Sequence, residues 1–349
     1  MKNAPLLNLV LAVNLALAVG FLLVIGRPIL VPIVTAVISV YIMVTASNAL
    51  HELPGLKRLP AAVPRILVLI VFALVLYGFA VVVASTVTEI VRVAPVYETN
   101  LTNLMTQIEE RFDIDTKSVF DRAFAATFGK IDLQALILTL LGGFTSVGTS
   151  AFLIVVYAAF LIAERRAFGF RISAALPDGE QAQKVEKILQ DINRQIGDYL
   201  TVKTMINLIL GAISYAILLV LGADFALFWA IIIAVLNYIP YVGSLLAVSF
   251  PVVLSIAQTG SIIHTITLAT FLIIAQVAVG NFLEPRLIGR QLNLSPFVVL
   301  VALSVWTALW GIAGAILAIP MTSMVVIVLM SFKETRFLGI LLSERVEKA

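Results

Sequence analysis

The chain contains 349 residues, of which 61% are hydrophobic and 12% are charged, and its mean hydropathy is +1.09. Soluble domains average about half apolar residues and roughly a quarter charged residues, so this composition excludes an ordinary soluble protein. A net charge of +3 is too small for a nucleic-acid-binding surface, and the lack of cysteine excludes disulfides and thiolate metal ligands. We expect no metal site, no cofactor and no nucleic-acid partner.

Charged residues gather in a few places and leave long stretches without any Asp, Glu, Lys or Arg. These stretches are residues 3–26, 28–51, 66–88, 133–163, 204–223, 225–283 and 291–332. A transmembrane helix needs about 20 mainly apolar residues to cross a hydrocarbon core of about 30 Å. The sequence therefore predicts an all-α, polytopic integral membrane protein with about 7–8 membrane-embedded elements.

The first half of the sequence is predicted to contain four transmembrane helices. Residues 1–88 hold the first three, and residues 133–163 form the fourth. The expected spans of the first three are residues 6–25, 29–49 and 64–87. Because the first apolar run lacks a small-residue cleavage site and further spans follow at once, we interpret it as a retained helix and not as a signal peptide.

Two polar segments follow the third and the fourth helix. Residues 89–132 carry eight acids and five bases, and their apolar residues recur at helical spacing. We expect an external amphipathic insertion there, which is either a connector packed on its neighbours or an element that gates transport or forms oligomers. Residues 164–203 contain a second amphipathic helix and are expected on the cytoplasmic side.

Basic residues near the membrane ends predict the orientation of the chain. The bases that follow the second and fourth helices are Lys57, Arg58, Arg65, Arg165, Arg166 and Arg171. By the positive-inside rule these loops are cytoplasmic, and the net acidic insertion is external. Both termini, including the polar tail 333–349, are then expected in the cytoplasm.

The uncharged stretch 225–283 is too long for one crossing and is interrupted at residues 237–243. Pro240 lacks a backbone donor and Gly243 frees the backbone, so we expect the helix to break there. The arm before the break would span only about 18 Å, which is too short to cross. Two short arms around such a tip indicate a re-entrant hairpin, although a surface loop between two tilted helices has the same composition.

A second long stretch, 297–332, repeats this pattern. Together the two stretches predict a transport core over residues 204–332 with one or two broken or re-entrant hairpins. The expected helix-breaking residues of the core are Pro285, Gly289, Pro296, Gly311, Gly314 and Pro320. Two broken elements in comparable positions hint at an internal duplication, but the residues themselves do not repeat.

Few polar residues interrupt the transport core, and they are the candidates for a solute pathway. The predicted pathway residues are Asn237, Tyr238, Pro240, Tyr241, Gly243, Gln276 and Asn281. The charged candidates for gating or ion coupling are Asp224, Glu284, Arg286 and Arg290. Since a proton or cation site normally uses an intramembrane carboxylate, Glu284 is either such a group or the partner of the two arginines in a local salt bridge.

Three motifs of the second half resemble those of the autoinducer-2 exporter (AI-2E) family. Residues 237–243 contain the sequence IPYVG, which resembles that family's signature. Residues 284–296 are similar to its P-x-x-x-G-x-x-L-x-L-x-P segment, and Gly311, Gly314 and Pro320 match its closing glycines and proline. Mild departures are Val202, where many members have glycine, and Ser244, where a proline often follows the signature.

The resemblance implies a bacterial-type cytoplasmic-membrane transporter that forms homo-oligomers, with pentamers known in the family. It implies export of a small polar solute such as autoinducer-2, or sodium(lithium)/proton antiport of a monovalent cation. The uncharged polar candidates favour the solute, and a non-transporting scaffold is disfavoured because it has no need for irregular backbone in the lipid bilayer. No hydrolase, kinase or P-loop pattern is present, so we do not expect an enzyme.

Overall fold

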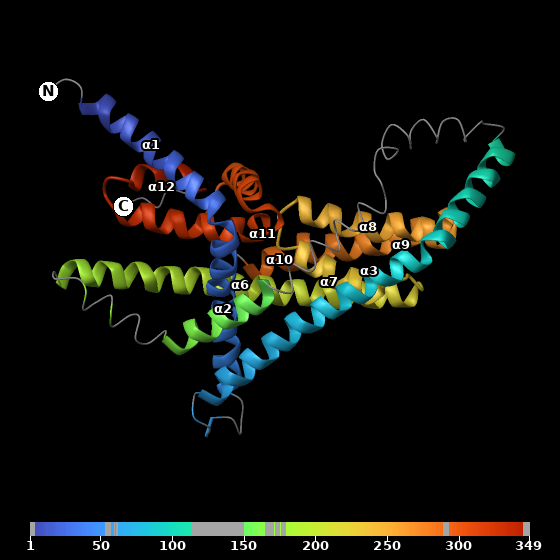
Figure 1. The fold of residues 1–349 in the computed structure, drawn as a ribbon, viewed down its shortest axis with the longest axis horizontal. Helices are drawn as coiled ribbons and strands as arrows, with labels where there is room; N and C mark the ends of the chain where they lie inside the picture. Colours follow the sequence, from blue (N-terminus) through green and yellow to red (C-terminus); the bar gives the residue numbers. More distant parts are fainter. Residues whose placement is uncertain are drawn as a thin grey trace. The chain divides into compact units, whose positions relative to one another are not determined.

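The computed structural model describes residues 4–52, 57–58, 60, 62–112, 150–164, 171, 175, 179–288 and 293–344. All regular structure in this part of the chain is helical (Figure 1). Six of its helices are long and apolar enough to cross a membrane. The prediction of an all-α, polytopic membrane protein is confirmed.

The helices of the first half begin where the apolar runs begin but do not all end where those runs end. α1 (Ala4–Ile25) and α2 (Arg27–His51) match the first two predicted spans. α3 (Ala62–Phe112) continues without interruption into the predicted insertion, past Pro95. The described part of the predicted insertion, up to Phe112, is therefore a continuation of the third helix, and residues 113–149 lie outside the described residues.

The same continuity is found in α6 (Gly179–Val220), which joins the predicted cytoplasmic helix to the charge-free stretch 204–223 at the start of the predicted transport core. One buried stripe runs along its second half with the i, i+3, i+4 spacing of a helix face. Its members are Leu200, Lys203, Asn207, Leu210, Ser214 and Leu218. The polar residues up to 203 and the apolar residues from 204 therefore form one continuous helix, because their buried side chains lie on the same helix face.

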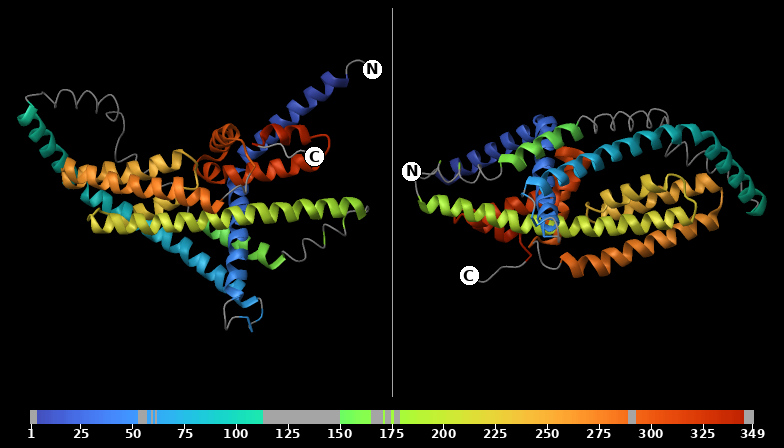
Figure 2. Two further views of the ribbon diagram at one scale, coloured as in Figure 1. Left: turned by 180° about the vertical axis from the view of Figure 1, so that it is seen from behind. Right: turned by 90° about the horizontal axis from the view of Figure 1, so that it is seen from below.

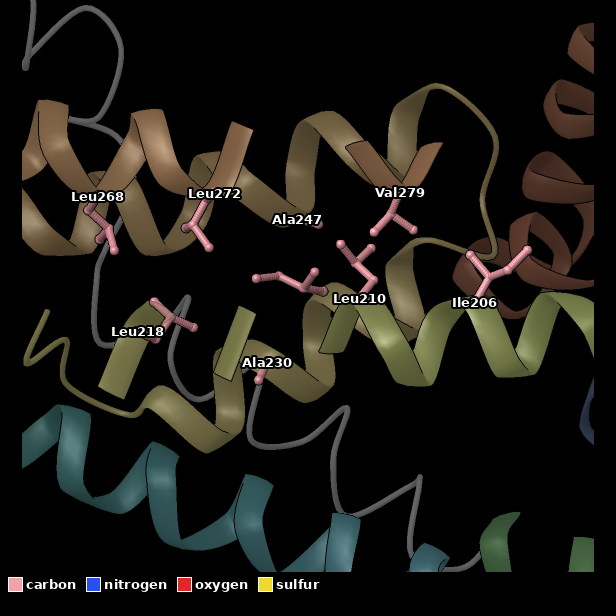
Figure 3. Close-up of a cluster of buried hydrophobic side chains, with 9 residues drawn as sticks. Ile206, Leu210, Leu218, Ala230, Ala247, Leu268, Leu272 and Val279 are labelled. Atoms are coloured by element: carbon pink, nitrogen blue, oxygen red, sulfur yellow. The ribbon is translucent and has the colours of Figure 1, made fainter. Parts of the chain in front are cut away.

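The chain forms two compact units, and the boundary between them falls within α3 and α6. The second unit contains most of α3, the second half of α6, α7 (Ala226–Leu236), α8 (Val242–Thr259) and α9 (Ile262–Val277). α8 and α9 lie side by side in each view (Figure 2). Leu210, Leu268 and Leu272 belong to the apolar core that holds these helices together (Figure 3).

The end of α9 widens into a π-helical turn, Ala278–Leu283, which leads directly into α10 (Glu284–Ile288). The prediction that Pro285 breaks the helix is wrong, because the helical path continues through it. Pro285 cannot donate a hydrogen bond to the preceding turn, and the wider turn accommodates that loss. Gly289 lies outside the described residues.

The first unit contains α1, α2, the helix over Ser150–Glu164, the start of α6, α11 (Pro296–Ser331) and α12 (Arg336–Leu342). Pro296 begins α11, as proline does in a first helical turn. Gly311 alone leaves helical geometry, with φ of 64° and ψ of −141°. The expected break at Pro320 is wrong, since this residue is buried within a regular arm of the helix.

Gly311 turns α11 back on itself. The indole nitrogen of Trp306 donates a hydrogen bond of 3.0 Å to the Thr322 hydroxyl. In a straight helix these residues would lie about 24 Å apart, so the arms on either side of Gly311 must face each other. We call this pair of arms, residues 296–310 and 312–331, the second hairpin.

Candidate functional site

The predicted break in residues 237–243 is confirmed, and it turns α7 into α8. We call α7, α8 and the tip between them the first hairpin. Val242 N donates to Pro240 O at 2.6 Å, so Tyr241 is the centre of a γ-turn with φ of 59° and ψ of −56°. This is a strained conformation for a residue with a side chain. A Cβ atom on Gly243 would overlap the carbonyl oxygen of Leu236, so the two arms need glycine at this place.

Three amide side chains meet at this tip. Asn237 is 6% exposed, and its Nδ2 donates to Asn207 Oδ1 on α6 at 2.8 Å. Gln276 on α9 donates from Nε2 to Asn237 Oδ1 at 2.9 Å. We call Asn207, Asn237 and Gln276 the amide ladder. It places two of the predicted pathway residues, Asn237 and Gln276, in direct contact and adds Asn207, which the predicted pathway did not include.

A buried ion pair lies one helical turn from the amide ladder. Lys203 Nζ and Glu284 Oε1 are 2.5 Å apart, with 6% and 27% of the two side chains exposed. On the next residue of α6, the Thr204 hydroxyl shares a hydrogen bond of 2.7 Å with the hydroxyl of Tyr238. The ion pair joins α6 to the start of α10. The positive charge of Lys203 and the negative charge of Glu284 therefore neutralise each other within the protein.

Among the described residues, Glu284 forms its ion pair with Lys203 and not with Arg286. Arg286 is exposed and makes no ion pair with the described residues, and Arg290 lies outside them. Lys203 was missed because it is the last residue of the polar segment 164–203, which was predicted to lie outside the transport core. The available signal was its position four residues before Asn207, which puts both on one helix face.

The remaining candidates do not join the amide ladder. Asn281 is exposed in the π-helical turn, and Tyr241 is 63% exposed at the tip. Asp224 lies at the other end of the hairpin, where it accepts a 2.7 Å hydrogen bond from the Tyr97 hydroxyl, and its backbone N–H donates to Gln258. Asp224 and Glu284 are therefore two separate sites, and Asp224 holds the root of the first hairpin against α3.

A hollow of about 330 Å³ lies between α8 and α9 beside the ladder. Ser244, Ser249 and Gln276 supply its polar lining, and the rest is aliphatic. The Oε1 atom of Gln276 is buried without a hydrogen-bond partner among the described residues. The hollow therefore presents two serine hydroxyls and one amide side chain in an otherwise aliphatic wall. Among the described residues, no cluster of His, Asp and Glu could hold a metal ion.

Broken hairpins with polar side chains at their tips, in a multi-pass helical protein, define a class of membrane transport proteins. The model of the AI-2E family transporters matches residues 11–334, and the chain belongs to this family.

The chain is 30% identical to the "AI-2 transport protein TqsA" of Escherichia coli K12, over 81% of this chain and 80% of that protein. It is 32% identical to a "Putative transport protein" of Borreliella burgdorferi, over 69% of this chain and 66% of that protein. A "Putative transport protein YhhT" of Escherichia coli K12 is 25% identical, over 82% and 80% of the two chains.

Proposed function

We propose that this transporter exports a small, polar, uncharged solute and that the amide ladder is part of its pathway. The single observation that carries the proposal is the contact of three uncharged amide side chains, from α6, the hairpin tip and α9, in a buried place. Amides both donate and accept hydrogen bonds, so they suit hydroxyl and carbonyl groups of a solute without requiring a charge on it.

The depth of the ladder supports this proposal. Asn207 lies about 20 Å along α6 from Val220, and Gln276 lies about 21 Å along α9 from Ile262. Val220 and Ile262 both adjoin the root of the first hairpin. If that root lies at one membrane surface, the tip ends inside a hydrocarbon core of about 30 Å. The first hairpin is then re-entrant, and its unpaired backbone groups need protein, water or solute as partners.

The ion pair supports a neutral solute over a cation. A cation site would need a carboxylate that is free to bind it, but Lys203 already occupies Glu284. An uncharged solute can pass such a pair without breaking it, so it avoids the large cost of leaving one buried charge alone. The printed name of the TqsA relative, "AI-2 transport protein", to which this chain is 30% identical, supports AI-2 as a candidate solute.

The orientation belongs to the same proposal. The root of the first hairpin, with Asp224, faces outside, and the amphipathic start of α6 faces the cytoplasm. Because the chain has no cysteine, single cysteines report this directly. An impermeant thiol reagent added to whole cells is expected to label a cysteine at Thr102 and to spare one at Gln183. The reverse labelling would contradict the orientation.

Flux into proteoliposomes tests the proposed function. Autoinducer-2 and sodium are compared in the same vesicles, with and without an imposed pH gradient. We expect flux of autoinducer-2 or another small polyhydroxylated solute, no sodium-coupled proton movement, and loss of solute flux in Asn237→Ala. Sodium flux coupled to protons, with no solute flux, would contradict the proposal.

A further inference from the structure

A second polar cavity lies in the first unit, apart from the amide ladder in the sequence and in its chemistry. It has a volume of about 290 Å³ and lies among α2, the first turn of α3 and the end of the helix over 150–164. Its lining residues are Met43, Val44, Ser47, Asn48, Arg65, Ile162 and Ala163. The proposed transport pathway uses none of them.

Two polar residues that line this cavity, Arg65 and Ser47, have no side-chain partner among the described residues. Arg65 is half-buried, and its guanidinium makes no ion pair or hydrogen bond with the described residues. Ser47 is only 5% exposed, lines the cavity and has no side-chain hydrogen bond to any described residue. His51 follows one turn later on the same helix, and its Nδ1 atom is also buried without a partner among them. Buried polar groups are normally paired, so the two lining residues Ser47 and Arg65 indicate a ligand in the cavity, and His51 lies on the same helix outside its lining.

The charge of the missing ligand follows from the groups around it. Arg65 brings a permanent positive charge whose planar guanidinium matches phosphate oxygens. It lies in the first turn of α3, where free backbone N–H groups and the helix dipole also favour an anion. On the helix over 150–164, Glu164 follows the lining residue Ala163 and forms an ion pair of 3.0 Å with Arg171. The cavity therefore favours an anion with several acceptor oxygens.

The other wall of the cavity is apolar, through Met43, Val44 and Ile162. Three helix ends meet here, and such ends in a multi-pass protein lie near the level of the lipid headgroups. A cavity lined by an arginine, a serine hydroxyl and aliphatic side chains matches an anionic headgroup together with the start of its acyl chain. We propose that this cavity is a binding site for the phosphate group of an anionic phospholipid, with Arg65, Ser47 and Asn48 as its polar contacts.

Purified full-length protein in detergent tests the site with phosphatidylglycerol, phosphatidylcholine and inorganic phosphate as probes. Native mass spectrometry counts bound lipid, and thermal unfolding reports stabilisation. We expect phosphatidylglycerol to bind at least about tenfold more tightly than phosphatidylcholine, because only the former leaves a net negative charge for the guanidinium. Inorganic phosphate at equal concentration is expected to leave the bound lipid in place, and its displacement of the lipid would overturn the lipid assignment in favour of a soluble anion.

Variants separate the site from general attraction between basic residues and lipid. Arg65→Gln is expected to lose about tenfold in affinity for phosphatidylglycerol, and Arg65→Lys to lose less because it keeps the charge. Arg336, an exposed base at the start of α12, is the matched control, and Arg336→Gln is expected to bind as the unchanged protein does. If Arg65→Gln does not fold, Ser47→Ala tests the site instead, and its affinity for phosphatidylglycerol is expected to fall about threefold. Binding unchanged in a folded Arg65→Gln or Ser47→Ala protein, or equal binding of the two lipids, overturns the proposal.

Discussion

In both hairpins of this protein a glycine lets one arm pack against a carbonyl oxygen of the other arm. The two hairpins differ in the side chains that they place at the turn. In the first hairpin Gly243 brings α8 onto the carbonyl oxygen of Leu236, and in the second Gly314 brings the later arm onto the carbonyl oxygen of Trp306. A Cβ atom at either glycine would overlap that oxygen. Close approach of two arms at a glycine is thus a property of both hairpins and by itself indicates no site.

The tips themselves are different. The first has five residues between its helices, and Asn237 and Tyr238 direct polar groups to α6 and α9. The second turns at Gly311 alone, and its neighbouring tryptophan donates to the carbonyl oxygen of Leu23 at 3.0 Å, which fixes the tip to the end of α1. We infer that the first hairpin carries the chemistry of transport and that the second is a support. The following predictions test this difference, from the largest expected effect to the smallest.

Both glycines at the close approach are expected to be essential for folding. Gly243→Ala and Gly314→Ala should each destabilise the protein by more than about 4 kcal/mol, because main-chain atoms and not a flexible side chain occupy the space of the new methyl group. Yield of monodisperse protein and its thermal unfolding measure the effect. Gly78→Ala in α3 is the control, since no atom lies within 4 Å of its Cβ position. Normal folding of either variant would show that the hairpin arms can separate.

The ion pair of Lys203 and Glu284 is expected to give the next largest effect. Lys203→Gln or Glu284→Gln alone leaves one buried charge unpaired, which costs about 3–5 kcal/mol. The double variant Lys203→Gln with Glu284→Gln should recover much of that stability, and a double-mutant cycle measured by thermal unfolding gives the coupling. Exposed pairs such as Arg92 with Glu89 should show little coupling by comparison. Additive losses in the cycle would mean that the two groups do not interact in the membrane.

The sequence predicted the broken helices well because their cause is local. The helix breaks at residues 237–243 and at Gly311 follow from the local backbone properties of proline and glycine. Pro285 and Pro320, where breaks were also predicted, lie within helices, so a proline alone does not decide a break. The ion pair could not be predicted in the same way, since Lys203 and Glu284 are 81 residues apart and are joined only by the packing of α6 on α10. The ends of α3 and α6 were misplaced for a related reason. Loss of hydrophobicity marks a membrane surface, but a helix continues past that surface while its buried face stays in phase.

Asn237 and Thr322 form a matched pair for separating transport from stability. Asn237→Ala leaves Asn207 and Gln276 without their shared partner, so we expect a loss of about 1–3 kcal/mol and at least about tenfold slower solute flux. Thr322→Val removes the acceptor of Trp306 in the second hairpin, so we expect a loss of about 1–2 kcal/mol with an unchanged rate of flux per folded molecule. Similar flux defects in both variants would contradict separate roles for the two hairpins.

Tyr241 is expected to give the smallest and most specific effect, with a sign opposite to the others. A side chain at φ of 59° and ψ of −56° costs on the order of 1–3 kcal/mol, whereas glycine adopts these angles freely. Part of that gain is lost because glycine has more freedom in the unfolded chain, about 0.5–1 kcal/mol. Since Tyr241 is 63% exposed, little packing is removed with its ring. Tyr241→Gly is therefore expected to raise the temperature of thermal unfolding slightly.

The effect of Tyr241→Gly on transport tests what the strain does. If the tip moves during transport, a relaxed γ-turn stabilises the conformation described here, and flux is expected to slow while stability rises. The converse change, Gly311→Ala in the second hairpin, places a side chain at φ of 64° and ψ of −141° close to the Arg27 guanidinium and should lower stability. A lower unfolding temperature in Tyr241→Gly would show that the ring stabilises the tip and that no strain is stored there. Unchanged flux with a raised unfolding temperature would show that strain is present but that transport does not depend on it.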